Sequence, residues 1–495
     1  MIALRRRRRL LAVVLAVVVA AVVAARVVGG GKAAKPQTIA VVKVTGETDV
    51  SRSRAIESES AVAIDPRDPR ILLAGSNAVA KPWMAVYSST DGGRRWRHGR
   101  LRGARGGDLC DTSDPTVAID RGGRQYYAFL GLRCAGRHLR PAGIFVAARR
   151  SAGARWRTFR LPVARRGRWT LLDDRPFLMV DNGTHSPHRG RLYVAWTRFV
   201  LDPNVFFLYP DEADDFEPVS EVALVSHSDD GGRRWSKPTQ LSAQNAPLEA
   251  RLATANDGTL YAVWRSEKTG AVQIARSADG KHFGPPRLVA GAVVKPRHSC
   301  GGSRSSVKAQ PKRCVSPNPV VSVDNSTGPR AGRVYVTWGT TSLNGSQDVY
   351  VAAFDPELDP LLGVGHVKQV NPVERFRGPD QFLPASSVDP STGRLWVCYY
   401  AGGSRRSRAR EARYACTFSD DGGETWAAPV FAAGRASNET VKRANRANGY
   451  GDYEGVAAAA GRAYAVWTDG RSLRRAHEEI YGAVLGSAVV PAPTP

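Results

Sequence analysis

Seven positions along the chain share one recurring context, and six of them hold polar or charged residues that could do chemistry. Each lies six residues before an aspartate, or the residue that replaces it, at the end of a short apolar run. Carboxyl groups give and take protons, and the planar guanidinium of arginine binds a carboxylate through two parallel hydrogen bonds. If these positions share one face of the fold, they predict a polar site; the alternative is a solvated rim of strand ends. The seven residues are Glu59, Asp114, Arg175, Arg251, Asn318, Leu383 and Glu454.

Further arginines stand where second strands are expected to end or where the next unit begins. In a chain with 71 Lys and Arg residues, each of them could equally be an ordinary surface residue. The segment 173–176 adds two acids before Arg175, which orient that arginine by ion pairs, bind a cation together with the acidic loop 211–217, or cap a turn. We expect the turn role for Asp173 and a site role for Arg175. The further arginines are Arg198, Arg265, Arg297, Arg377 and Arg471.

The elements that must position these residues are marked by an eight-residue box that occurs at 89–96, 228–235 and 419–426. Its common pattern is Ser-x-Asp-x-Gly-x-x-Trp, and an apolar or alternating run precedes each copy. The Ser and Asp side chains can bond turn N–H groups, Gly allows the backbone angles of a tight turn, and Trp packs back on the sheet. Three full copies predict a repeated β-hairpin architecture.

A second repeat lies upstream of each box and consists of two strands, the second ending in an aromatic residue. A shortened box at 277–283 and a degenerate one, with Ser151 in place of Asp, belong to the same series. The spacing predicts an all-β, seven-bladed β-propeller with four strands per blade. The seven units are 61–73, 115–129, 176–196, 252–264, 319–338, 384–399 and 455–467.

The last unit lacks an outer strand, and we expect residues 38–44 to supply it, which would tie the first and last blades together. In an up-and-down blade, the starts of the first strands share one face with the loops between strands two and three. The boxes lie on the opposite face. The polar positions of the first strands are therefore expected around one mouth of the central channel.

Box turns on a propeller resemble the Asp-box (BNR repeat) family, most familiar as the sialidases, over about residues 38–486. The resemblance implies an exo-alpha-sialidase-type glycoside hydrolase, and a six-bladed sialidase-type ring is the alternative fold. It also implies a clamp of three arginines on the substrate carboxylate, a tyrosine nucleophile paired with glutamate, and an aspartate proton donor. Two features depart from the family: seven units are counted here, and the F/Y-R-I-P signature is absent.

Placing these roles on this chain gives a candidate catalytic set. The clamp would be Arg175, Arg251 and Arg471, with Arg377 as a substitute. Tyr453 and Glu454 would form the nucleophile pair, which requires the irregular segment 449–455, because neighbouring residues of a strand point to opposite faces. The remaining roles are Asp114 as proton donor, and Arg198, Arg265, Glu59 and Asn318 as substrate-binding residues.

Two insertions are expected on the same face as the candidate site. Residues 199–221 mix acids with Phe206, Phe207 and Tyr209, which either stack on sugar rings or pack as a lid. Residues 295–318 are basic, and a disulfide between Cys300 and Cys314 would pin them.

The first thirty residues are set apart from the fold. A basic block, Arg5 to Arg9, precedes apolar residues 10–25, as in a cleaved signal peptide or an uncleaved membrane anchor. Both interpretations place the rest of the chain outside the cytoplasm. The expected organisation is a signal or anchor at 1–30, a linker at 31–37, the propeller at 38–486 and a Pro-rich tail at 487–495.

The six cysteines form three neighbouring pairs and agree with export. We predict local disulfides between Cys110 and Cys134, Cys300 and Cys314, and Cys398 and Cys416. The formal net charge is +26, carried mainly by arginine. A charge of this size indicates either affinity for anionic glycans, nucleic acid or acidic lipid, or a compositional bias with a solvated surface. Outside the leader the basic residues are scattered along the sequence, without the interleaved aromatics that nucleic acid prefers, so the compositional bias is expected to explain most of the charge.

The expected function is an exported, sialidase-like hydrolase that removes terminal acidic sugars from glycans. The alternatives are a non-catalytic propeller that binds glycans or proteins at the cell surface, and an extracytoplasmic assembly factor. The expected partner is a glycan or another anionic carbohydrate, with no nucleic acid, no cofactor and no metal. We expect a monomer that contacts membrane only through its N-terminal segment.

Overall fold

The computed structural model divides the chain into a large unit, Val41–Ala488, and a small one that combines Met1–Ala40 with Val489–Pro495. Only the large unit is considered further. The predicted leader, residues 1–30, lies outside the described residues, and no helix in the described part is long and apolar enough to cross a membrane. The described residues are 38–103, 109–135, 138–162, 169–202, 218–241, 247–266, 269–291, 305–362, 366–373, 378–403, 408–444, 449–471 and 477–491.

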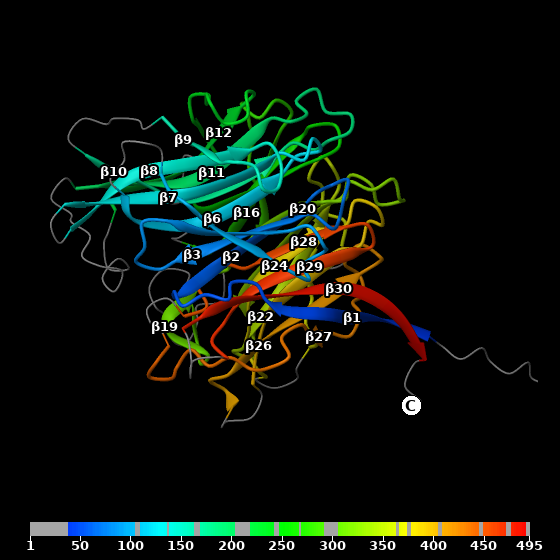
Figure 1. The fold of residues 1–495 in the computed structure, drawn as a ribbon. Helices are drawn as coiled ribbons and strands as arrows, with labels where there is room; N and C mark the ends of the chain where they lie inside the picture. The colour runs from blue at the N-terminus through cyan, green and yellow to red at the C-terminus, as the bar shows by residue number, and fades with distance from the viewer. Residues whose placement is uncertain are drawn as a thin grey trace, which may run out of the picture. The chain divides into compact units, whose positions relative to one another are not determined.

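Seven four-stranded antiparallel sheets form the blades of a β-propeller (Figure 1). Blades one to three are β2 (Glu57–Ile64), β3 (Leu72–Ala78), β4 (Met84–Ser89) and β5 (Arg97–Leu101); β6 (Leu109–Ile119), β7 (Gln125–Ala135), β8 (His138–Arg149) and β9 (Arg157–Arg160); and β10 (Thr170–Val180), β11 (Leu192–Leu201), β12 (Ser220–Ser228) and β13 (Thr239–Gln240).

Blades four to six follow in chain order, and a two-stranded hairpin precedes blade five. The strands are β14 (Pro247–Thr254), β15 (Leu260–Ser266), β16 (Val272–Ser277) and β17 (Arg287–Ala290); the hairpin β18 (Ser305–Val307) and β19 (Gln310–Val315); β20 (Val320–Val323), β21 (Val334–Thr341), β22 (Gln347–Phe354) and β23 (Lys368–Gln369); and β24 (Gln381–Val388), β25 (Leu395–Gly402), β26 (Ala412–Ser419) and β27 (Val430–Phe431).

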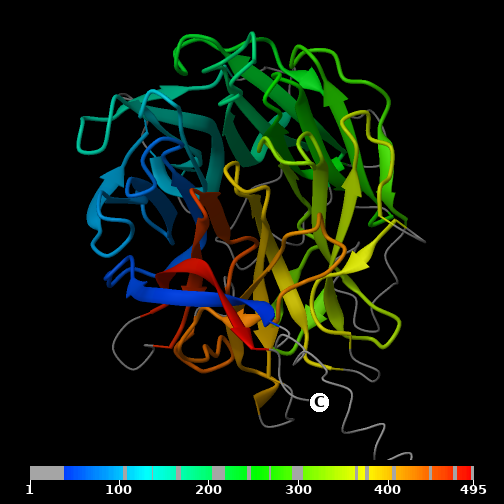
Figure 2. The same cartoon turned by 90° about the vertical axis from the view of Figure 1, so that its right-hand side faces the viewer.

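The seventh blade confirms that the two ends of the chain close the ring. It contains β28 (Gly455–Ala459), β29 (Arg462–Asp469) and β30 (Glu479–Pro491), and β1 (Thr38–Asp49) pairs with β30 as its outer strand. Figure 2 shows β1 and β30 side by side. The predicted strand at 38–44 was correct in place and shorter than the observed one.

The core lies between neighbouring blades rather than within one sheet. Tyr126 and Val146 of blade two pack with Leu178 and Trp196 of blade three, for example. The second strands supply the largest buried side chains, as the alternating aromatic pattern predicts. Replacing one such tryptophan by alanine is expected to cost about 3–5 kcal/mol. The tryptophans less than 2% exposed are Trp196, Trp264, Trp396 and Trp467.

The three full boxes form the same turn. In the first, Gly93 N–H donates to Ser89 Oγ at 2.9 Å, and the N–H groups of Arg94 and Arg95 donate to Asp91 Oδ1 at 3.1 and 3.0 Å. Trp96 Nε1 donates to the Gly93 carbonyl at 3.1 Å, so the indole folds back on its own turn. The other two boxes repeat the bonds to serine and aspartate.

Two of the three predicted disulfides are confirmed. Cys110 bonds Cys134 across β6 and β7, and Cys398 bonds Cys416 across β25 and β26. Cys314 is also disulfide-bonded, and its predicted partner Cys300 lies outside the described residues. Disulfides of this kind are typical of oxidising compartments outside the cytoplasm.

Candidate active site

The first strands of six blades share an unusual backbone feature five residues before each strand ends. A non-glycine residue there adopts a left-handed φ between 46° and 59°, and in five of these blades a β-bulge shifts the strand register at the same place. This conformation costs an L-residue about 1–2 kcal/mol. Strain of this kind is often found at functional sites. We call these residues the mouth ring: Glu59, Asp114, Arg175, Glu249, Asn318 and Leu383.

In blade four, the residue of the mouth ring differs from the one that the sequence series predicted. Arg251 was placed in this series by counting back from Asp257, but the left-handed residue of blade four is Glu249. Alanine at position 255 replaces the recurring aspartate, and Asn256 corresponds to Asn182 and Asn325, each of which follows that aspartate. Position 251 is two residues further along the strand and also lines the channel cavity.

An ion-pair network joins the ring to a loop and a hairpin. Glu249 accepts hydrogen bonds from Arg265, with Nε at 2.9 Å, and from Arg175. The second terminal nitrogen of Arg175 binds Asp452 Oδ2 at 2.6 Å. Arg313, from β19, binds Asp452 at 2.6 Å and Glu59 at 3.2 Å. The network therefore links blades one, three and four to the segment before β28.

The carboxyl groups at the mouth have widely separated pKa values. Burial, with the nearby Asp114 and Asp452 carboxyls, raises the pKa of Glu59 to about 8, and Arg313 and Arg175 offset only part of this shift. Burial and the Asp174 carboxyl raise the pKa of Asp114 to about 7. Burial would also raise the pKa of Glu249, but Arg265 and Arg175 lower it to about 2. Protonated and ionised carboxyls therefore coexist here near neutral pH.

Glu59, Asp114 and Asp174 form a series that runs from the interior toward solvent. Asp114 makes side-chain hydrogen bonds to both of the other carboxyls. Glu59 is 2% exposed and Asp114 7%, whereas the side chain of Asp174 is 24% exposed. Burial also raises the pKa of Asp174. A proton held in this series is therefore accessible to a ligand through Asp174.

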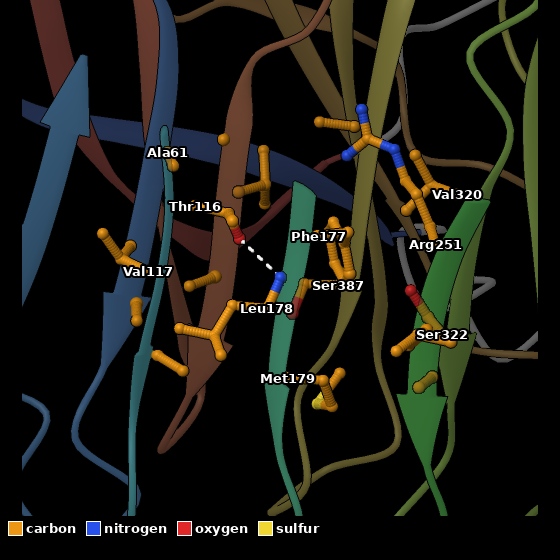
Figure 3. A pocket seen from close by; sticks show the side chains of 18 of the residues that line it. Ala61, Thr116, Val117, Phe177, Leu178, Met179, Arg251, Val320, Ser322 and Ser387 are labelled. Atoms are coloured by element: carbon orange, nitrogen blue, oxygen red, sulfur yellow. Dashed lines mark hydrogen bonds between the residues drawn. The ribbon is translucent and has the colours of Figure 1, made fainter. Parts of the chain in front are cut away.

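Arg251 lies in the channel beneath this network and has neutral partners. Its Nη2 donates to Asn318 Oδ1 at 2.6 Å, and its guanidinium lies 5.2 Å from the Tyr453 ring and 5.5 Å from the Phe177 ring. Within the described residues no carboxylate forms an ion pair with it. Figure 3 shows Arg251 and Phe177 projecting into the cavity. Because a half-buried cation without a counter-ion attracts an anion, Arg251 is the best-placed anion-binding group in the channel.

The channel cavity measures about 370 Å³ and is walled by the first strands of all seven blades. The wall includes apolar side chains such as Ala61, Val117 and Ala385, and neutral polar ones such as Ser322 and Ser387. The charged residues Arg175 and Glu249 line its mouth together with Tyr453. A ligand with one charged end and a less polar body fits this arrangement.

The structure separates the predicted Tyr453–Glu454 pair. The Tyr453 hydroxyl donates to the Pro115 carbonyl at 3.2 Å, and burial and the Asp114 carboxyl raise its pKa well above the usual range. Glu454 instead accepts hydrogen bonds from Ser60, from the Tyr400 hydroxyl at 2.5 Å and from Thr468 N–H at 2.9 Å. The two neighbours point to opposite sides of the chain, so Asp114 and Glu59 are the carboxyls that act on Tyr453.

The predicted clamp of three arginines is not assembled. Arg175 and Arg251 share the cavity wall, but Arg471 pairs with Asp469 at 2.6 Å and Glu47 at 2.7 Å. Arg198 is bound by Asp173, with Nε and Oδ1 2.6 Å apart.

Asp173 also accepts a hydrogen bond from Trp196 Nε1 at 2.9 Å, so it holds an ion pair instead of capping a turn. Of the other predicted binding residues, Glu59 and Arg265 belong to the network and Asn318 binds Arg251. Arg297, Arg377 and the aromatic residues Phe206, Phe207 and Tyr209 lie outside the described residues.

Sequence reasoning missed four members of the site. Aligning Asn256 with Asn182 and Asn325 would have identified Glu249, which lies six residues before Ala255. Asp174 was noticed as a neighbour of Arg175 but given no role. Asp452 lies in a loop and Arg313 in a hairpin. Counting residues back from the recurring aspartate predicts no site residue in such segments. Among the described residues, no group of three or more His, Cys, Asp and Glu side chains is arranged to hold a metal ion.

Comparison with known proteins assigns neither a family nor an activity to this chain. No protein-family model and no curated protein matches this chain. Its fold is similar to that of a protein of unknown function from Dyadobacter fermentans, at 12% identity over 90% of this chain and 99% of that one, with a TM-score of 0.47.

Two further similar structures are enzymes. One is the alpha-L-arabinofuranosidase of Fusarium graminearum, at 11% identity, 90% and 97% coverage and a TM-score of 0.44. The other is the Hadza microbial sialidase Hz136, at 13% identity, 91% and 94% coverage and a TM-score of 0.42. At this distance such likenesses say nothing of substrate or mechanism.

Proposed function

We propose that this protein is an extracytoplasmic, sialidase-like glycoside hydrolase that acts on terminal acidic sugars at the mouth of its channel. The observation that carries the proposal is the arrangement around Arg251: a cation with neutral partners lies beside carboxyls that differ in protonation. Glycoside hydrolysis uses one acid to protonate the leaving oxygen, while another group acts on the sugar ring.

The roles follow from exposure and contacts. Arg251 binds the carboxylate of the sugar, and Asn318 holds its guanidinium in place. Asp174 donates the proton to the leaving oxygen because it is the most exposed carboxyl of the series, and Asp114 positions that proton. This arrangement moves the donor role from Asp114 to its neighbour.

Tyr453 is the proposed nucleophile, as the resemblance to sialidases implies. Its phenol must lose a proton as it attacks. That proton passes through Asp114 to the carboxylate left on Asp174 once Asp174 has protonated the leaving oxygen, and Glu454 takes no part. Arg175 orients Glu249 and Asp452 and is itself neutralised by them, so its role is to position the site.

One observation favours the second candidate, a propeller that binds an acidic sugar without cleaving it. Arg175 and Arg313 are bound by carboxylates of the protein itself, which leaves one arginine instead of three for a substrate. Binding requires only Arg251 and the apolar wall, whereas hydrolysis also requires Asp174 and Tyr453.

Release of a fluorogenic aglycone from a sialoside tests the first candidate. We expect turnover in the wild type, loss in Asp174→Asn and Tyr453→Phe, and a raised KM in Arg251→Ala; Arg408→Ala, an exposed change on the same face, is the matched control. Turnover that Asp174→Asn and Tyr453→Phe leave unchanged would contradict the assignment. Arg251-dependent binding of a sialoside without any turnover would establish the second candidate.

A further inference from the structure

The face opposite the channel mouth carries a series of arginines and a lysine that the turn itself does not require. In each box two residues stand between the last glycine position and the aromatic residue, and their backbone N–H groups bond the box aspartate. Glu424 and Thr425 make the same two bonds in blade six, so the turn accepts any side chain here. The residue types at these positions are therefore free to serve another purpose.

In blades one to four these positions are basic. They hold two arginines in blades one and three, lysine and histidine in blade four, and one arginine in the degenerate turn of blade two. Lys and Arg make up 71 of 495 residues, yet they fill six of these eight positions. We call the six the basic arc: Arg94, Arg95, Arg155, Arg233, Arg234 and Lys281.

The basic arc extends over four consecutive blades, and its charged groups are exposed and not bound by acids of the protein. All six residues are exposed, and within the described part of the chain none of their side chains forms an ion pair. Nearby acids are occupied: Asp91 and Asp230 bind their own turns, and Asp229 pairs with Arg191 at 2.6 Å. Blades one to four are consecutive in the ring, with shared cores between one and two, two and three, and three and four.

We propose that the basic arc binds a linear acidic polysaccharide that crosses the turns of blades one to four. One turn offers a small anion two arginines at most, and exposed charges of this kind bind it weakly. A polymer with a charge on each sugar engages several turns at once, so the contacts add and counterions are released. This surface is distinct from the channel and does not depend on hydrolysis.

Two observations favour a polysaccharide over other polyanions. Trp96 and Trp235 donate to the glycine carbonyls of their own boxes and are folded back, so these turns of the arc offer no stacking platform for the bases of a single strand. The disulfides place the protein in an oxidising compartment, where acidic envelope polymers are available. Among the described residues, the exposed large apolar side chains lie outside the box turns, so the arc offers none that could insert into a lipid surface.

The test is binding of the full chain to polygalacturonate, measured as Kd over a series of salt concentrations. We expect the affinity to fall steeply with salt. The variant Arg94→Glu, Arg95→Glu, Arg233→Glu, Arg234→Glu should lose about tenfold or more in affinity and flatten the salt dependence. The matched control reverses four exposed arginines on the mouth face, Arg54, Arg408, Arg410 and Arg435, and should lose less than about threefold.

A gain of binding provides a second test that misfolding cannot imitate. Glu424→Arg with Thr425→Arg adds a basic pair in blade six and should tighten binding about twofold to threefold. Equal losses in both reversal variants would overturn the proposal, because net charge alone would then explain binding. Tighter, arc-dependent binding of oligothymidylate or of phosphatidylglycerol vesicles would overturn the choice of partner, as would a lack of polygalacturonate binding at physiological salt.

Discussion

The mouth face and the box face both require left-handed backbone, and they obtain it from different residues. In the three full boxes, glycines adopt φ between 74° and 95°. In the mouth ring, charged and polar residues such as Glu59, Asp114 and Arg175 adopt φ between 51° and 59°. Glycine accepts this conformation without steric strain, whereas the ring residues must be held in it by their contacts. The box turns therefore keep their backbone conformation without help from other contacts, whereas the residues of the candidate site depend on such contacts.

Carboxyl groups on the two faces also differ in their preferred charge. At Asp91, burial acts to raise the pKa, but the Arg95 N–H and the Ser89 hydroxyl lower it. At Glu59 and Asp114 the pKa is raised, because burial and neighbouring acids outweigh the arginines. Box acids thus stabilise the fold when ionised, as Glu249 does at the mouth, whereas Glu59 and Asp114 stabilise it when protonated. Each of the following predictions tests this contrast.

The largest effect is expected for Glu249→Gln, which removes the buried carboxylate that Arg265 and Arg175 bind. Arg265 is 2% exposed, and breaking a buried pair from one side typically costs about 3–5 kcal/mol. Urea unfolding followed by tryptophan fluorescence measures this loss. The control is Asp229→Asn, which removes a partner of Arg191 that is itself 61% exposed and should cost less than about 1 kcal/mol. Equal costs for the two variants would contradict the contrast between the faces.

The second prediction is that the free energy of unfolding falls as the pH rises from about 5 to about 8. The folded-state pKa values of Glu59 and Asp114, about 8 and about 7, exceed their ordinary values of 4.5 and 3.8. The folded protein therefore holds more protons than the unfolded chain in this range, and raising the pH favours unfolding. A decrease on the order of 3 kcal/mol is expected in urea titrations at successive pH values.

Two variants separate the faces in the same pH series. Glu59→Gln mimics the protonated carboxyl and should make the decrease above about pH 5 less steep. Asp91→Asn should leave that decrease unchanged and alter only the acid side, because a lowered pKa adds stability above its unfolded value. A decrease that Glu59→Gln leaves intact would show that other buried acids cause it.

The box repeat predicted the ring and its closure, because each Ser-x-Asp-x-Gly-x-x-Trp turn fixes where two strands meet. Counting back from the recurring aspartate then found most of the mouth ring. It failed in blade four, where Ala255 replaces the aspartate, so Arg251 was taken for Glu249. It also assumed that neighbours in sequence act together, whereas Glu454 turns away from Tyr453.

Contacts between distant loops could not be predicted from strand spacing. Arg313 reaches Asp452 across 139 residues and Glu59 across 254, and no repeat links these positions. The basic arc was missed for a related reason: its members lie far apart in the sequence, so their charge looked scattered until the topology placed their turns on one face. The repeated boxes predict the local geometry of each turn. The candidate site depends instead on residues outside the repeat, which the ring brings together.

Two neighbouring glycines of the first box are expected to differ in how much stability is lost when each is replaced by alanine. A Cβ at Gly93 would lie 2.1 Å from the buried Tyr464 ring, whereas one at Gly92 would meet nothing within 4 Å. Both residues have positive φ, so each alanine carries a conformational cost of about 1–2 kcal/mol. Gly93→Ala should cost about 1–3 kcal/mol more, because it displaces the ring that joins blades one and seven. Thermal unfolding compares the two variants, and a Gly92→Ala loss as large as that of Gly93→Ala would argue against this joint.

The smallest expected effect concerns backbone strain. A substitution should relieve this strain in a turn of the box face but not in the mouth ring. Ala460 and Gly461 form the two-residue turn between β28 and β29, with φ of 54° and 78°. Asparagine tolerates this conformation better than alanine at the first position of such a turn, so Ala460→Asn should stabilise by about 0.5–1 kcal/mol. Leu383→Asn relieves similar strain in the mouth ring but removes a side chain that is 1% exposed, so a net loss of about 2 kcal/mol is expected. Urea midpoints of both variants decide the matter: a stabilising Leu383→Asn would mean that packing does not hold the ring in its strained conformation.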